Sequence, residues 1–159
     1  MSASAAATGM ELQYEFEFHA MLKPPLEIGP GPFGTRVFFE ATEGEVIGER
    51  LSGQLLTGGG DWLLVGADGW GRLDVRTQIK THDGAHVYVT YHGVLEMTEE
   101  FQKAFAEGRE TGWGDQYFRT APRLETGDPR YAWVNQSVFV AEGRAYPGLA
   151  VQYRVFRVT

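Results

Sequence analysis

Cysteine is absent from the 159 residues, which excludes disulfide bonds, zinc sites made of thiolates and a cysteine nucleophile. Long apolar runs are also absent, because no segment approaches the roughly 20 residues that a membrane-spanning helix needs. The first ten residues, MSASAAATGM, have neither the basic start nor the apolar stretch of a secretory signal. We therefore expect a cytoplasmic protein in which residues 1–10 are a disordered tail and residues 11–159 form a single domain.

Positive charge is scarce. The 14 lysines and arginines are outnumbered by 21 acidic residues, which gives a net charge of −7. Such a surface repels phosphate backbones and anionic lipids on average. We expect neither nucleic acid nor a membrane as a partner, whereas the composition is compatible with a homodimer.

Helical periodicity occurs in one short segment, residues 98–108 (TEEFQKAFAEG), where Thr98 is a suitable N-cap and Gly108 a suitable stop. The rest of the chain alternates apolar and polar residues in short runs such as residues 11–20 (ELQYEFEFHA), which is typical of half-buried strands. Residues 23–34 contain four of the seven prolines and are predicted to be a loop. Little helix, about eight to ten strands and many glycines predict an all-β fold, a single antiparallel β-barrel with one short helix.

Two Asp-Gly pairs, at residues 68–69 and 83–84, are flanked by alternating runs and predict two β-hairpins. If each pair is a two-residue turn, counting along the strands places Asp61 opposite Arg76 and Arg76 opposite Tyr91. The resulting row of three side chains is interpreted either as an exposed pairing of small energetic weight or as a polar patch at the mouth of a ligand cavity. The opposite face is more apolar and is predicted to line the core or lumen; it carries Trp62, Val75 and His92.

Residues 117–136 (YFRTAPRLETGDPRYAWVNQ) combine aromatic, charged and amide side chains in a connection that two prolines stiffen. The strand predicted to follow would carry an aromatic platform with an amide at its edge, made of Tyr131, Trp133 and Asn135. This segment is interpreted either as part of a binding site or as a structural tie in which Arg119 and Glu125 fasten the loop to the barrel.

Two apparent motifs are rejected. Residues 29–34 (GPGPFG) have the spacing of a dinucleotide-binding loop, but two prolines interrupt it and a strand rather than a helix follows. The histidines are either on opposite faces of their strands or too far apart to chelate a metal. We expect neither a cofactor nor a metal.

Two long blocks resemble the domain-of-unknown-function 3237 family, also called uncharacterised protein family 0311. They are GERLSGQLLTGGGDWLLVGADGWGRLDVRTQIKTHDGAHVYVTYHG at residues 48–93 and YFRTAPRLETGDPRYAWVNQSVFVAEG at residues 117–143. The resemblance covers the chain from about residue 11 and implies a small β-barrel of lipocalin-like appearance, but no catalytic residues. The recurring positions of the family fall on Arg50, Gly53, Asp61, Trp62, Asp68, Gly69, Arg76, Thr81, Asp83, Gly84, Tyr117, Phe118, Arg119, Glu125, Gly127, Tyr131, Trp133 and Asn135.

The sequence departs from this family pattern at Glu49 and Leu124, where proline and phenylalanine are usual. The start of the nearby strand and the packing beneath the loop are therefore expected to differ.

The barrel is predicted to bind a small apolar or aromatic organic compound that carries a carbonyl or a carboxylate. Its predicted ligand-binding residues are Trp62, Arg76, Tyr88, Tyr117, Arg119, Trp133 and Asn135. The alternative is a cofactor-free isomerase, cyclase or lyase in which Asp61 or Glu125 is the general base and a neighbouring arginine or tyrosine stabilises an oxyanion. A third interpretation is a structural or oligomerising role, which an interior plugged by aromatic side chains would favour.

Overall fold

The computed structural model describes residues 7–159, in which ten strands surround one core. The strands are β1 (Leu12–Leu22), β2 (Leu26–Gly31), β3 (Gly34–Gly48), β4 (Gly53–Leu55), β5 (Gly59–Val65), β6 (Trp70–Thr81), β7 (His86–Glu96), β8 (Phe118–Glu125), β9 (Val138–Tyr146) and β10 (Ala150–Val158). An α-helix, α1 (Glu99–Ala106), and a 3-10 helix, η1 (Pro129–Gln136), complete the fold. The predicted all-β class and the helix within residues 98–108 are confirmed.

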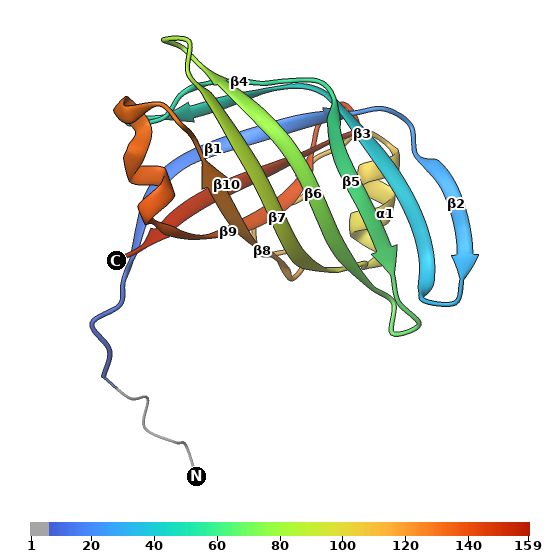
Figure 1. The fold of residues 1–159 in the computed structure, drawn as a ribbon. Coiled ribbons are helices and arrows are strands. Elements are labelled where there is room, and N and C mark those ends of the chain that lie inside the picture. The colour runs from blue at the N-terminus through green and yellow to red at the C-terminus, as the bar shows by residue number, and fades with distance from the viewer. Residues whose placement is uncertain (1–6) are drawn as a thin grey trace.

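The wall is a closed antiparallel barrel. Its strands follow the order β1-β10-β9-β8-β7-β6-β4-β3, and β3 pairs again with β1, so this path has no free edge. Strand β5 pairs with both β3 and β6 beside the short β4, and β2 extends β3 as a projecting hairpin (Figure 1). Closure confirms the barrel and excludes an open layered sheet.

Alternation of side chains positions the core. In β6, residues with inward side chains such as Val75, Thr77 and Ile79 are buried, whereas Arg76 and Lys80, at alternate positions, are exposed. The alternation of apolar and polar residues that predicted the strands therefore also determines which side chains face the lumen and which face solvent.

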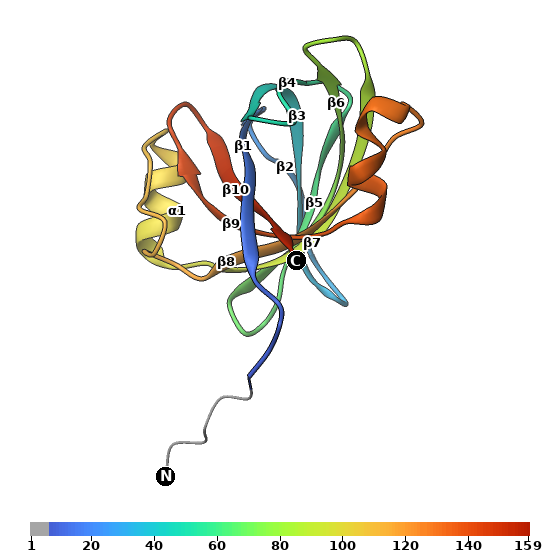
Figure 2. The same cartoon turned by 90° about the vertical axis from the view of Figure 1, so that its left-hand side faces the viewer.

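The two helices lie at opposite ends of the barrel (Figures 1 and 2). At the η1 end the interior is solid, because Phe16, Leu51, Val134 and Phe139 are each at most 1% exposed. Above them the buried carboxylate of Glu15 accepts hydrogen bonds from two arginines, at 2.7 Å from Arg50 Nη2 and 3.1 Å from Arg157 Nε. At the other end α1 leaves part of the lumen unfilled.

Two predictions of local structure are wrong. Residues 23–34 are not a loop throughout, because β2 lies within them; Pro30 is tolerated there since β2 is an edge strand, and a bulge between Glu27 and Gly29 absorbs the irregularity. The strand predicted around residues 131–136 is the helix η1, which begins at an Asp128 N-cap followed by Pro129.

The predicted register of both hairpins is also wrong, by one residue each. Gly69 and Gly84 have φ of 79° and 91°, and the amide nitrogens of Gly66 and Thr81 donate to the carbonyls four residues later. Each loop is thus a three-residue turn that ends in a left-handed glycine, rather than a two-residue turn. Val75 of β6, not Arg76, lies between Asp61 and Tyr91.

Candidate functional site

A cavity of about 600 Å³ occupies the α1 end of the barrel. Most of its lining is apolar, with contributions from β1, β3, β4, β5, β6, β7, β8 and β10 and from α1. Exposed residues of the lining mark the mouth, which lies between the β1–β2 connection at Pro24 and Pro25 and the helix at Gln102 and Ala106. A pocket of this size and polarity is typical of sites for small organic ligands.

Four polar side chains enter this apolar space from the wall: Asp61 from β5, Thr77 from β6, Tyr91 from β7 and Tyr153 from β10. Among residues 7–159, no lysine, arginine or histidine lines the cavity. A ligand would therefore meet hydrogen-bonding groups on one part of the wall and no fixed positive charge.

Asp61 is inserted into a gap in the ladder between β5 and β6. The two strands pair at Asp61–Val75 and again at Leu64–Arg72, but not between these points. The free amide of Asp74 donates to Asp61 Oδ1 at 3.0 Å, and Arg36 Nη1 donates to the free carbonyl of Trp62 at 2.8 Å. One carboxyl oxygen is thus fixed by the backbone, while Oδ2 has no hydrogen-bond partner within the described part of the chain.

The surroundings of Asp61 disfavour its charge. Burial is the main reason why the pKa of this carboxyl is raised to about 7. The hydrogen bond from the Asp74 amide and the charge of Arg36 lower the pKa, whereas the Asp74 carboxylate raises it. The side chain keeps partial accessibility because it lines the hollow of the cavity. Near neutral pH it can therefore exist with or without its proton.

The two tyrosines form one unit. Their rings meet edge to face with centroids 5.3 Å apart. Burial raises the pKa of both phenols, and the nearby Tyr91 raises the pKa of Tyr153 further. Both phenols remain protonated at neutral pH and serve as hydrogen-bond donors.

Thr77 has a hydroxyl with no partner within residues 7–159, although the residue is only 2% exposed. A buried hydroxyl without a partner costs about 1–3 kcal/mol, so the Thr77 hydroxyl lowers the stability of the free protein.

Thr77→Val is accordingly expected to leave the free energy of unfolding unchanged or to raise it by up to about 1 kcal/mol, as measured by urea denaturation of the free protein. Thr81→Val is the matched control, because the Thr81 hydroxyl donates to Asp83 Oδ1 at 2.6 Å and accepts from the Ala85 amide. We expect this control to lose about 1–2 kcal/mol. Equal losses in the two variants would contradict a free hydroxyl at Thr77.

Most of the ligand-binding residues expected from the sequence do not line this cavity. Arg76, Tyr88, Tyr117 and Arg119 lie on the outside of the wall, and Trp62 is 40% exposed and packs on Phe38. Glu125, expected as a possible base, is also exposed and pairs with Tyr88 across β7 and β8. Of the predicted site residues, the structure brings only Asp61 to the cavity wall.

Trp133 and Asn135 lie at the opposite, solid end. The Arg50 guanidinium lies 3.7 Å from the centre of a Trp133 ring. Asn135 accepts a hydrogen bond from the Thr126 amide and donates to the Thr126 carbonyl. These contacts fasten residues 117–136 to the barrel, as the structural interpretation of this segment predicted, although they do not involve Arg119 or Glu125.

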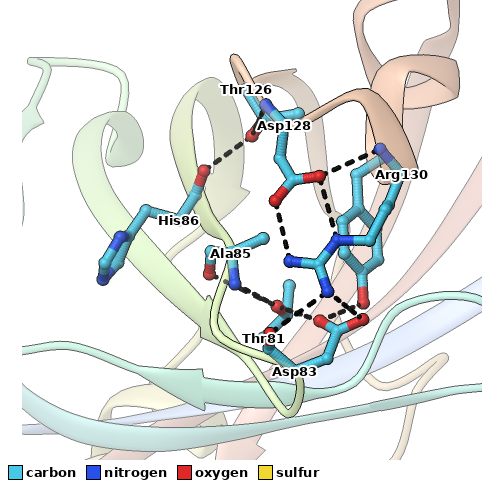
Figure 3. Close-up of polar contacts among 8 residues, drawn as sticks. Thr81, Asp83, Ala85, His86, Thr126, Asp128 and Arg130 are labelled. Carbon is cyan, nitrogen blue, oxygen red and sulfur yellow. Dashed lines mark hydrogen bonds and ion pairs between the residues drawn. The ribbon is translucent and has the colours of Figure 1, made fainter.

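A polar network fastens η1 to the β6–β7 hairpin (Figure 3). Asp83 accepts hydrogen bonds from the hydroxyls of Thr81 and Tyr131 and forms an ion pair with Arg130 at 3.2 Å. These hydrogen bonds lower the pKa of Asp83. Thr81, Asp83 and Tyr131, which the family resemblance singled out, thus belong to this junction and not to the cavity lining.

Sequence reasoning missed Thr77 and Tyr153. Both share the inward parity of their strands with buried neighbours, Thr77 with Val75 and Tyr153 with Val155. Their inward-facing positions could have been predicted from the alternation along each strand. Only the correct hairpin register, however, shows that Thr77 lies on the same face of the wall as Asp61 and Tyr91.

No helix among residues 7–159 is long and apolar enough to span a membrane. Within the same residues, no group of three or more histidine, aspartate or glutamate side chains is placed to hold a metal ion.

Known proteins with similar sequences and folds include two bacterial relatives. A UPF0311 protein of Rhodopseudomonas palustris is 34% identical over 131 residues, covering 82% of this chain and 86% of the relative. A UPF0311 protein of Clostridium acetobutylicum is 32% identical over 133 residues, or 82% and 84% of the two chains. A crystal structure of a conserved protein of unknown function from Rhodopseudomonas palustris matches with a TM-score of 0.87 and 31% identity, over 96% of this chain and all of the other.

Two fungal proteins are more distant. A PR-toxin biosynthesis cluster protein of Penicillium roqueforti is 28% identical over 119 residues, which are 72% of this chain and 61% of that protein. A structure described as an enzyme from Penicillium herquei shares the fold with a TM-score of 0.69 at 19% identity, over 99% of this chain and all of the other.

The family described as "Protein of unknown function (DUF3237)" matches residues 10–158. Since this match spans nearly the whole chain and the bacterial relatives exceed 30% identity over most of their length, the protein belongs to the DUF3237 family of β-barrels.

Proposed function

We propose that the barrel binds a small, uncharged, largely apolar organic molecule that carries a carbonyl or hydroxyl oxygen. The observation that supports this most directly is the cavity of about 600 Å³, whose largely apolar wall carries Asp61, Thr77, Tyr91 and Tyr153, with Glu27 and Gln102 at its mouth. The apolar wall favours a molecule of low polarity, and the polar group orients one oxygen. A carboxylate is disfavoured as the polar group of this ligand, because none of the lining residues within the described range 7–159 is cationic and ionised Asp61 would repel it.

A variant that fills the lumen tests this proposal. Ala41→Phe, at a buried position of the cavity wall, is expected to weaken the binding of an environment-sensitive apolar dye at least 10-fold by steric exclusion. Ala121→Phe, at an exposed position of β8, is the matched control and is expected to bind the dye like the wild type. Fluorescence titration measures both, and circular dichroism checks that each variant is folded.

Native mass spectrometry of gently purified protein is the complementary measurement. A co-purified compound that is lost in Ala41→Phe and retained in Ala121→Phe would identify the ligand class. Equal dye affinity in the two variants would contradict the cavity as the binding site.

A second candidate function is acid–base catalysis on such a compound, by a cofactor-free isomerase, cyclase or lyase. The Asp61 carboxyl favours this function, because only its Oδ1 is hydrogen-bonded and its pKa is raised to about 7. A general base is most effective when its pKa lies near the pH at which the enzyme works. The relative named as a biosynthesis cluster protein also supports it. Glu125 is not part of this proposal, since it lies on the outer wall. A cytoplasmic location and a homodimer stay predictions.

A further inference from the structure

The cavity contains one group that can both take and give a proton near neutral pH. Asp61 is the only aspartate, glutamate or histidine that reaches its buried part among residues 7–159, since Glu27 of the lining is exposed at the mouth. The two tyrosines keep their protons, because burial raises the pKa of both. A reaction completed by this set must therefore return the proton that it removes, or exchange it with solvent through the same carboxyl.

Asp61 is held in a fixed orientation for such a transfer. The Asp74 amide fixes Oδ1 through the gap in the β5–β6 ladder, and the side chain lines the cavity. Oδ2 is left for a ligand. Because the backbone rather than a flexible side chain fixes the carboxyl, no reorganisation is required when a substrate arrives.

Tyr91 lies on the same row as Asp61. Val75 separates them, so their strands are two places apart in the wall, or about 10 Å between backbones. Both side chains line the cavity, and the ring of Tyr153 packs edge to face on that of Tyr91. A flat substrate between them would meet the carboxyl with one atom and the phenol with another.

We infer that the barrel catalyses a 1,3-proton transfer in an enolisable ketone, with Asp61 as the proton carrier and Tyr91 as the donor to the developing enolate oxygen. This inference rests on the proposed binding of an uncharged carbonyl compound in the same cavity. The substrate class is a β,γ-unsaturated ketone of low polarity, and the product is its conjugated isomer.

The step balances without a second reactant. The Asp61 carboxylate removes a proton from the carbon between the carbonyl and the alkene. The electron pair of that C–H bond becomes a C=C bond, and the carbonyl π pair moves to the oxygen, which accepts the Tyr91 hydrogen bond. An oxygen pair of the enolate then re-forms the carbonyl, and the enol C=C pair moves to the bond between the α and β carbons. The former alkene pair takes the proton at the γ carbon, and the O–H bond pair of the acid returns to the Asp61 carboxylate.

Proton exchange is the most general test, since it detects the first half of the reaction. The probe is a bicyclic β,γ-unsaturated ketone in D₂O, followed by NMR for loss of the α-hydrogen and by ultraviolet absorbance for the conjugated product. Wild-type protein is expected to accelerate both signals. Asp61→Asn, which keeps an acceptor for the Asp74 amide, is expected to lower the rate by about 10²–10⁴-fold, and Tyr91→Phe by about 10–10³-fold.

The pH profile and a control variant separate this role from a structural one. The rate should rise as Asp61 ionises around pH 7; the groups that face it are Asp74, Arg36, Tyr91 and Tyr153. Asp68→Asn makes the same chemical change at an exposed turn and is expected to keep wild-type rates. An unchanged rate in Asp61→Asn, or a profile flat from pH 5 to 9, would overturn the inference.

Binding of the same ketone is measured by displacement of the apolar dye, so that the two proposals fail in different ways. If the ketone binds wild-type protein and Asp61→Asn equally but neither exchange nor isomerisation is accelerated, the catalytic inference is overturned while the binding proposal stands. If neither the dye nor any ketone of the series enters the cavity, the proposed function itself is overturned.

Discussion

Asp61→Asn is expected to raise the free energy of unfolding at pH 8 by about 2–4 kcal/mol and to leave it nearly unchanged at pH 4. The carboxyl has a folded-state pKa of about 7 against an ordinary value of 3.8. A difference of about three pKa units corresponds to about 4 kcal/mol, and the partial accessibility of the side chain to the cavity reduces this figure. Asparagine carries no charge to bury at any pH and still accepts from the Asp74 amide.

The pH dependence has a definite sign. Well below its unfolded-state pKa of 3.8 the Asp61 carboxyl is protonated in both states and favours neither, and at pH 4 only about 0.5 kcal/mol of the difference has developed. As the pH rises towards 7, the unfolded chain ionises first, so the folded wild type loses stability relative to Asp61→Asn. Above pH 7 the carboxyl is ionised in both states and the full difference persists.

Urea denaturation at pH 4, 6 and 8 measures this effect. Asp68→Asn is the control with the opposite trend, because hydrogen bonds from Arg72 lower the pKa of Asp68 to about 2, so its ionised form stabilises the folded state down to lower pH. A constant difference between the wild type and Asp61→Asn from pH 4 to 8 would show that burial does not raise the pKa of Asp61. The predicted gain in stability together with a loss of rate would place Asp61 among residues retained for activity at the expense of stability.

Gly44→Ala is expected to lower the free energy of unfolding by at least about 3 kcal/mol, or to prevent folding. A Cβ at this position would lie 2.0 Å from the carbonyl oxygen of His19 and 3.0 Å from the Cβ of Leu55. Both obstacles belong to paired strands, because Gly44 pairs with Ala20 of β1 and with Leu55 of β4. The clash is therefore relieved only by separating the strands that close the barrel.

Gly114→Ala is the matched control for this prediction, since a Cβ at Gly114 meets nothing within 4 Å. The control is expected to remain within about 0.5 kcal/mol of the wild type. Thermal and urea denaturation compare the two variants, and similar stabilities would show that β1 and β3 can move apart at little cost.

The fold could be predicted from the sequence because its signals are local. Alternation of period two identified most strands, and the Thr98 cap and Gly108 stop identified α1. The strand β2 was missed because its proline and glycines are typical of loops, and only the edge position makes them compatible with pairing.

The site could be predicted only in part because it depends on register. An Asp-Gly pair suits both a two-residue turn and the last positions of a three-residue turn, and the choice between them shifts the pairing by one residue. That shift exchanges the faces of a strand relative to its neighbour. It replaced Arg76 by Val75 between Asp61 and Tyr91 and moved the row from the outer wall to the lumen.

The recurring family positions could not reveal the cavity either. Of these positions only Asp61 and Phe118 line it, whereas others, such as Asp83 and Asn135, maintain the junction at the solid end. A sequence pattern does not distinguish residues that hold the barrel together from residues that face a ligand.

The pairing of β1 with β10 has a consequence for biosynthesis. Leu12 lies opposite Val158, so β1 can form this pairing only after β10, which is synthesised much later, has left the ribosome. Contacts of such sequence separation form slowly because a long loop must close first. The nascent chain therefore cannot enclose its lumen until β10 has been synthesised, and the apolar lining of the future cavity stays open to chaperones, or to a guest molecule, until then.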